Sequence, residues 1–310
     1  SGIMLFGMSW IFGIAGSTYL DQILPAMRTA GSHAAPLVGL LMLFCGMFFK
    51  LAVFPFHFWT PDVYQGASNE TTAFISSLPK VAAVAVLARF CALAAPDSIA
   101  LPTLLTVLSV CSMFYGNLTA LVQKDVKRML GFSGIAHAGY IMLGMVTLKA
   151  WGFATALYYG IGYLFMMLAA FLVLYTVAPN GGNVNVKNLN GLSRRSPLLA
   201  FIMTVSMFAL AGIPPFAGFM GKFMLLTSAF KSGYVLLVVI AAINTAIGIY
   251  YYLQVVRAVY AEDEANTADV PVTTAGTRVA GVCLVAITLA LGIMPETVVD
   301  MAVKAMQAAW

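Results

Sequence analysis

Long apolar stretches separated by short polar segments run along the whole chain. A helix needs about 20 apolar residues to cross a membrane. The pattern predicts an all-α polytopic membrane protein with nine spans, at 1–16, 35–56, 70–95, 99–122, 129–148, 150–177, 197–230, 234–260 and 276–294. A short amphipathic segment follows, so we expect one transmembrane helix bundle over 1–294 and a C-terminal interfacial helix over 295–310.

At least two of these spans are expected to be discontinuous. The segment 197–230 is too long for one simple helix, and Pro214 and Pro215 remove two backbone donors from its middle. Pro55 interrupts the second span, and Pro79 interrupts the third. Irregular backbone at membrane depth is tolerated only where it is buried in protein or lines a water-filled cavity. Breaks of this kind are typical of transporters, whose functional groups lie at the interruption.

Composition supports the membrane class and narrows the chemistry. Charged residues make up only 9% of the chain, whereas soluble domains carry about 25%. The basic residues are scattered between apolar runs, so the net charge of +5 does not predict nucleic-acid binding. The four cysteines are far apart without metal-ligand spacing, and no glycine-rich nucleotide motif is present. We therefore expect no metal, disulfide or cofactor in this chain.

The loop charges predict an orientation, because cytoplasmic loops of membrane proteins carry more lysine and arginine. Strict alternation of the spans puts one group of basic residues on the same side: Lys124, Lys127, Arg128, Lys187, Arg194, Arg195, Arg257 and Arg278. A smaller group falls on the opposite side: Arg28, Arg89, Lys149, Lys231 and Lys304. The sequence therefore predicts residue 1 on the cytoplasmic side and the C-terminus on the outer side.

Three lysines lie inside apolar runs, each within about two helical turns of a proline: Lys50, Lys80 and Lys222. A lysine at the centre of a membrane helix costs about 2.5–3.5 kcal/mol, and such residues usually face a protein interior or a water path. The alternative is a side chain that extends to the interface, which competes most at Lys50 and least at the mid-span Lys80. A row of buried lysines bridged by water can store and pass protons.

His137 is the fourth candidate, in the middle of the span 129–148. Ser133 and Tyr140 lie about one turn away on the same helix face. One interpretation of His137 is a proton relay, which the three lysines in the same membrane favour. The alternative is a buried histidine that is held by a local hydrogen bond. Packing or interfacial roles are the more common explanation for tyrosines in such segments. Several of them can nevertheless line a water path, namely Tyr158, Tyr159, Tyr163 and Tyr250 to Tyr252.

Four segments in order carry a family resemblance: FKLAVFPFHFWTPDVYQGA, LPKVAAVAVLARF, QKDVKRMLGFSGIAHAGYIMLG and ALAGIPPFAGFMGKF. They resemble subunit N of the bacterial NADH–quinone oxidoreductase, respiratory complex I, one of its antiporter-like membrane subunits. The resemblance covers essentially the whole chain. It implies an inverted-repeat antiporter-like fold in which Lys50, Lys80, His137 and Lys222 match the family's proton-translocating residues.

The same resemblance implies a longer family fold of fourteen helices. The nine spans predicted here would be the last nine, so we expect the first five helices to be absent. The family's glutamate partner of the first lysine lies on one of those helices, which leaves Lys50 without its expected counter-ion.

The resemblance also implies a role and a setting. We expect a proton-translocating subunit without a redox centre, in a bacterial inner membrane and against other antiporter-like subunits and lipid. Flavin, iron–sulfur clusters and quinone would belong to partner subunits. Two alternatives remain, a subunit of a multisubunit cation/proton antiporter and a purely structural fragment of the membrane arm. Copurification with flavin and iron–sulfur subunits would separate the first alternative from complex I.

Overall fold

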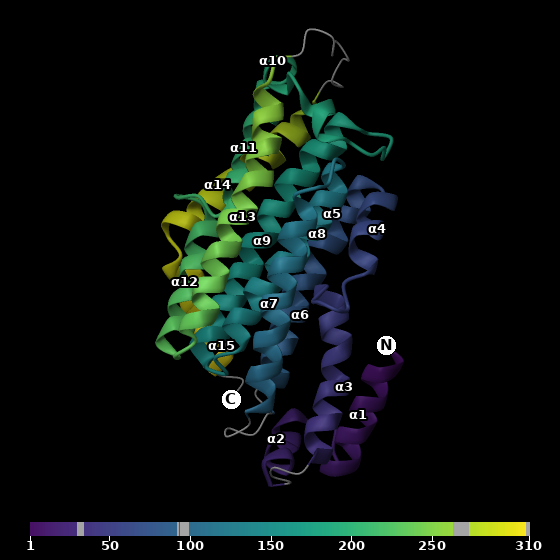
Figure 1. Cartoon of the computed structure of the whole chain (residues 1–310), viewed down its shortest axis with the longest axis vertical. Helices are drawn as coiled ribbons and strands as arrows, with labels where there is room; N and C mark the ends of the chain where they lie inside the picture. Colours follow the sequence, from purple (N-terminus) through teal and green to yellow (C-terminus); the bar gives the residue numbers. More distant parts are fainter. Residues whose placement is uncertain (30–33, 92, 94–98, 263–272, 308–310) are drawn as a thin grey trace.

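The computed structural model describes residues 1–29, 34–91, 93, 99–262 and 273–307. Within these residues the structure is an elongated bundle of helices, and most of them run along its long axis (Figure 1). The only extended pairing found there is an isolated bridge between Asp125 and Asn185. The expected all-α fold class is therefore confirmed.

The helices keep the order of the predicted apolar segments. They are α1 (Gly2–Ala15), α2 (Leu20–Thr29), α3 (Ala34–Leu51), α4 (Trp59–Gly66), α5 (Asn69–Ser76), α6 (Leu78–Cys91), α7 (Ala100–Ala120), α8 (Val126–Met145), α9 (Ala150–Val177), η1 (Val186–Leu189), α10 (Leu192–Arg195), α11 (Pro197–Ala211), α12 (Ala217–Lys231), α13 (Val235–Tyr260), α14 (Ala275–Ile293) and α15 (Glu296–Gln307).

The predicted number of nine spans is not confirmed. In the described chain, five helical segments are long and apolar enough to cross a membrane, or six if the bent pair α1 and α2 forms one span. The other predicted spans contain helices that are short, interrupted or polar. Prolines end α3 at Leu51 and divide α11 from α12, while Lys127, Ser133 and His137 lower the hydropathy of α8.

Two of the three interruptions predicted from proline divide their spans completely. The backbone leaves α3 at Leu51, passes Pro55 and resumes as α4, which lies above α3 in Figure 1. The second break separates α11 from α12 at the prolines 214–215. Pro79 has a weaker effect, because it lies in the first turn of α6, where a helix has no use for the missing N–H. Accordingly, α5 and α6 together still form one apolar segment of 23 residues.

The centre of the bundle is formed by α8 and α9. Helix α9 packs against α5, α6, α8, α11, α12, α14 and α15, and α7 packs closely on α8. All residues from 129 to 147 are buried. Because α8 is buried on every side over this stretch, His137 is held far from the surface.

Two amphipathic helices complete the described chain. The apolar side of α15 buries Val299, Ala302 and Met306, and the helix lies on α9. Its place at a membrane interface stays a prediction. Helix α2 was not predicted, because its ten residues do not form an apolar run. Ile23 and Met27 are its buried residues among those whose burial is described.

Candidate functional site

Lys222 is buried on α12 and points at the end of α11. Its Nζ donates to the carbonyl oxygens of Leu210 and Ala211 at 3.1 and 3.0 Å. The last carbonyls of a helix have no partner within the helix and carry the negative end of its dipole. Gly212 ends α11 with φ +87°, and a Cβ at this position would lie only 3.0 Å from Lys222 Cδ. The break in the helix therefore creates a polar receptor for the ammonium group.

Lys80 is buried on α6, with 2% of its surface exposed. Its Nζ lies 5.8 Å from the ring centre of Tyr64 and 5.2 Å from that of Tyr163, within the range of cation–π attraction. The Gly134 carbonyl oxygen is 3.5 Å away. Neither of the ion pairs found among the described residues involves Lys80 or Lys222. Lys222 Nζ also lies 4.9 Å from the ring centre of Tyr140, so both lysines are held by carbonyl dipoles and aromatic rings.

His137 on α8 lies between two tyrosine hydroxyls. Its Nδ1 is 2.7 Å from the hydroxyl of Tyr159 on α9, and its Nε2 is 2.9 Å from the hydroxyl of Tyr252 on α13. Both lysines are close enough to act electrostatically on His137. The structure therefore brings together three of the four residues predicted for the site. It also shows that two tyrosines for which packing was the commoner explanation contact the histidine.

Lys50 lies apart from this group. It is the second-last residue of α3, and its side chain is exposed. In the part of the chain that the structure describes, no hydrogen bond or ion pair of this side chain is found. Its predicted role remains a prediction that rests on the resemblance alone.

Sequence reasoning missed the fully buried Lys127, which it placed in a cytoplasmic loop. Its Nζ donates to the carbonyl oxygens of Ala67 and Gly181 at 3.0 and 3.1 Å, which ties the end of α4 to the segment after α9. The signal that could have placed Lys127 on a helix, although not its burial, is Asp125. This residue caps α8 and makes the helix begin at Val126, so that Lys127 lies in its first turn.

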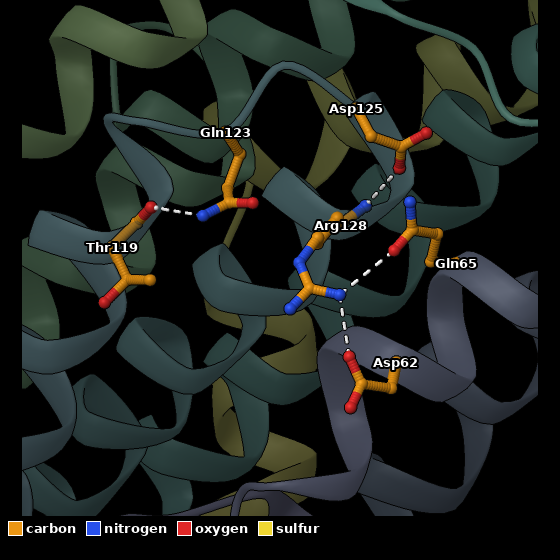
Figure 2. A network of polar contacts seen from close by, with 6 residues as sticks. All are labelled: Asp62, Gln65, Thr119, Gln123, Asp125 and Arg128. Carbon is orange, nitrogen blue, oxygen red and sulfur yellow. Dashed lines mark hydrogen bonds and ion pairs between the residues drawn. The ribbon is translucent and has the colours of Figure 1, made fainter.

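The polar contacts around Asp125 join α8 to α4 (Figure 2). Asp125 Oδ1 accepts from the backbone N–H of Arg128 at 2.8 Å. Burial raises the pKa of the Asp125 carboxyl, although this N–H and the charge of Lys127 act in the opposite direction. Arg128 Nη1 donates to Asp62 Oδ1 at 2.7 Å and to Gln65 Oε1 at 3.0 Å. Exposed pairs of this kind contribute at most about 1 kcal/mol, so they orient α4 more than they stabilise it.

Replacing Lys127 by alanine is expected to destabilise the protein by about 1–3 kcal/mol, because two half-buried carbonyl groups lose their charged donor. The matched control is Lys124→Ala, which changes an exposed lysine three residues earlier. Thermal unfolding of the purified protein checks this, with a lower Tm expected for Lys127→Ala alone. Equal Tm values for the two variants would contradict the role assigned to Lys127.

The chain has extensive similarity to known proteins. Residues 1–248 match the family described as NADH:quinone oxidoreductase/Mrp antiporter, TM. The protein named NADH-quinone oxidoreductase subunit N 2 of Opitutus terrae is 54% identical over 301 residues, which are 97% of this chain and 63% of that protein. The chain thus spans less than two thirds of the length of this relative.

Solved structures agree with the sequence match. A chain in the structure of respiratory complex I from Thermus thermophilus with bound aureothin has a TM-score of 0.84 and 36% identity; the match covers 96% of this chain and 65% of that one. A chain of the Mrp complex from Dietzia has a TM-score of 0.86 at 22% identity, over 99% of this chain and 65% of that one, and shows the shared fold. From its sequence and its fold, the chain belongs to the transmembrane family of NADH:quinone oxidoreductase and Mrp antiporter subunits.

Proposed function

We propose that this chain is a proton-translocating part of an NADH–quinone oxidoreductase and that protons pass through Lys80, His137 and Lys222. The observation that carries the proposal is the group of two buried lysines around a doubly hydrogen-bonded histidine in the middle of the bundle. Ionisable residues inside a membrane protein mark ion pathways more often than structure. Lys50 enters the proposal only through the family resemblance.

The surroundings of the three residues suit proton transfer. Each can bind a proton, and each has a neighbour that stabilises the charged form: carbonyl oxygens at Lys222, aromatic rings at Lys80 and hydroxyls at His137. A proton on one of them raises the cost of a second proton nearby, because like charges repel strongly in a low-dielectric interior. Loading of one site therefore favours release from another, which is what stepwise transfer requires.

The relatives named subunit N support the proposed setting. The chain would lie in a bacterial inner membrane, in contact with lipid and with other membrane subunits of complex I, including antiporter-like ones. Quinone reduction in neighbouring subunits would drive the protons, and flavin and iron–sulfur clusters would be bound there. Residue 1 would lie on the cytoplasmic side and the C-terminus on the periplasmic side.

A Lys80→Met variant tests the proposal in the assembled complex reconstituted into liposomes. Proton pumping is expected to fall at least about tenfold, because positioned proton-transfer groups contribute about 100-fold or more. Arg89→Met changes an exposed cation on the same helix and serves as the control. Full pumping by an assembled Lys80→Met complex would refute the proposed pathway.

The second candidate function is that of a cation/proton antiporter subunit, favoured by the fold shared with the Mrp complex chain. The lysines suit it equally well. Copurification with flavin and iron–sulfur subunits would favour complex I, whereas copurification with antiporter subunits alone would favour this alternative. A purely structural role would be supported if pumping stayed normal after Lys80 and Lys222 were both neutralised.

A further inference from the structure

Both ring nitrogens of His137 lie against side chains that can donate or accept a hydrogen bond. Tyr159 contacts Nδ1 and Tyr252 contacts Nε2. The hydroxyl of Tyr252 is also 2.5 Å from Ser133 Oγ. All four side chains are buried. The polar contacts of the imidazole are therefore hydroxyl groups, on α9 and α13.

Hydroxyl partners allow the protonation state of His137 to change. A neutral imidazole has one donor and one acceptor nitrogen, whereas an imidazolium has two donors. A carbonyl partner satisfies only a donor nitrogen, but a hydroxyl satisfies a nitrogen in either state. His137 can therefore gain or lose a proton, or change tautomer, while Tyr159 and Tyr252 stay hydrogen-bonded to it.

Neighbouring tyrosines show what a fixed structural contact looks like in the same bundle. Tyr158, next to Tyr159 on α9, donates to the carbonyl oxygen of Leu291. Tyr251, next to Tyr252 on α13, donates to Asn117 Oδ1 at 2.9 Å. Each of these hydroxyls donates to an oxygen that can only accept. The two tyrosines on His137 differ from them in this respect.

We propose that Tyr159, His137, Tyr252 and Ser133 form a proton wire, which makes both tyrosines and the serine further proton-carrying residues of this chain. The inference rests on the proposed function and deepens it. A proton that arrives at the Tyr159 oxygen releases the phenolic proton to Nδ1, and the Nε2 proton passes to Tyr252. Tyr252 gives its own proton to Ser133, whose hydroxyl proton leaves. One proton enters and one leaves: each hydroxyl oxygen forms one O–H bond and breaks one, while His137 gains a proton at Nδ1 and loses the one at Nε2. The imidazole thereby changes tautomer, and it must return to the Nε2–H form before the next transfer.

The ends of the wire lie towards the two lysines. Tyr159 packs against α12 at Gly221, where an added Cβ would lie 2.6 Å from the tyrosine ring, and Lys222 is the next residue. Ser133 precedes Gly134, whose carbonyl oxygen is 3.5 Å from Lys80 Nζ. The hydrogen-bonded wire itself crosses α9, α8 and α13, and the transfers between its two ends and the lysines are part of the proposal.

The first test compares three phenylalanine variants in the assembled complex in liposomes. Tyr159→Phe and Tyr252→Phe are each expected to lower pumping about tenfold, while Tyr158→Phe, which also loses one buried hydrogen bond, keeps it. Equal losses in all three would show a packing effect and overturn the wire. If Tyr159→Phe and Tyr252→Phe pump normally while Lys80→Met loses pumping, the wire is overturned and the proposed function stands. If Tyr159→Phe, Tyr252→Phe and Lys80→Met all pump normally, the wire and the proposed function are both overturned.

The second test covers variants that fail to assemble. Difluorotyrosine in place of Tyr159 keeps the ring and the hydroxyl but makes the hydroxyl more acidic. A proton-carrying Tyr159 then shifts the pH profile of pumping, which a merely structural hydroxyl does not do, so an unchanged profile would overturn the proposal. Ser133→Ala removes only the far end of the wire and is expected to reduce pumping with normal assembly; unchanged pumping would remove Ser133 from it.

Discussion

A Lys222→Met variant of the assembled complex is expected to pump protons about 100-fold more slowly than the unchanged complex, the lower end of the range for a positioned proton-transfer group. Two carbonyl oxygens at the end of α11 hold the Lys222 ammonium group. In the described part of the chain, Lys222 is the only side chain found to donate a hydrogen bond to these two carbonyls. Proton uptake by reconstituted vesicles during quinone reduction measures the loss.

Two further variants show whether Lys222 carries protons or only provides charge. Lys222→Arg keeps a cation for the α11 carbonyls, but arginine stays protonated at all accessible pH values. It should therefore assemble well and still fail to pump. Lys231→Met, an exposed position at the end of the same helix, should pump normally. Restored pumping in Lys222→Arg would show that a fixed positive charge is enough, and the proton-carrying role would be wrong.

Gly292→Ala is expected to destabilise the protein by about 1–3 kcal/mol or more, the usual range for overpacking. Gly292 on α14 lies directly against the break between α11 and α12. An added Cβ would overlap the carbonyl oxygen of Pro215 and lie 2.6 Å from the carbonyl carbon of Phe216. Backbone atoms cannot turn aside as a side chain can, so the break itself must shift. A lower Tm in thermal unfolding would show this cost.

The matched control is Gly276→Ala on the same helix, where an added Cβ would meet only Thr274 Oγ1 at 3.8 Å. It should unfold at the Tm of the unchanged protein. Because the break also supplies the carbonyl oxygens that hold Lys222, Gly292→Ala is further expected to reduce pumping in complexes that assemble. Identical Tm values for the two variants would show that α14 does not constrain the break.

Much of the helical layout was predictable, because apolar length and proline are local properties. Each predicted span corresponds to a helix or to a pair of helices, and the breaks occur at Pro55 and at the prolines 214–215. The number of nine spans is not confirmed, since the same prolines shorten the helices on either side of each break. Helix α2 was missed, because an amphipathic helix of ten residues does not form an apolar run.

The ionisable residues of the candidate site could be predicted from the sequence, but the residues that they contact could not. A lysine or histidine inside an apolar run stands out from the sequence, and Lys80, His137 and Lys222 proved to be buried together. Lys127 did not stand out, because it lies beside other charged residues at the start of α8, yet it is fully buried. Burial of such a residue depends on what the adjacent segments cover.

The sequence by itself determined where helices form, where they break and which side chains can carry a proton, because these follow from neighbouring residues. Only the tertiary structure decided what each proton-binding group contacts. Lys80 meets a carbonyl 54 positions away, and His137 meets a tyrosine hydroxyl 115 positions away. Such contacts depend on how α6, α8 and α13 pack, which local patterns do not specify. The physical reason is that a buried polar group must find its partner on whichever helix the packing places beside it.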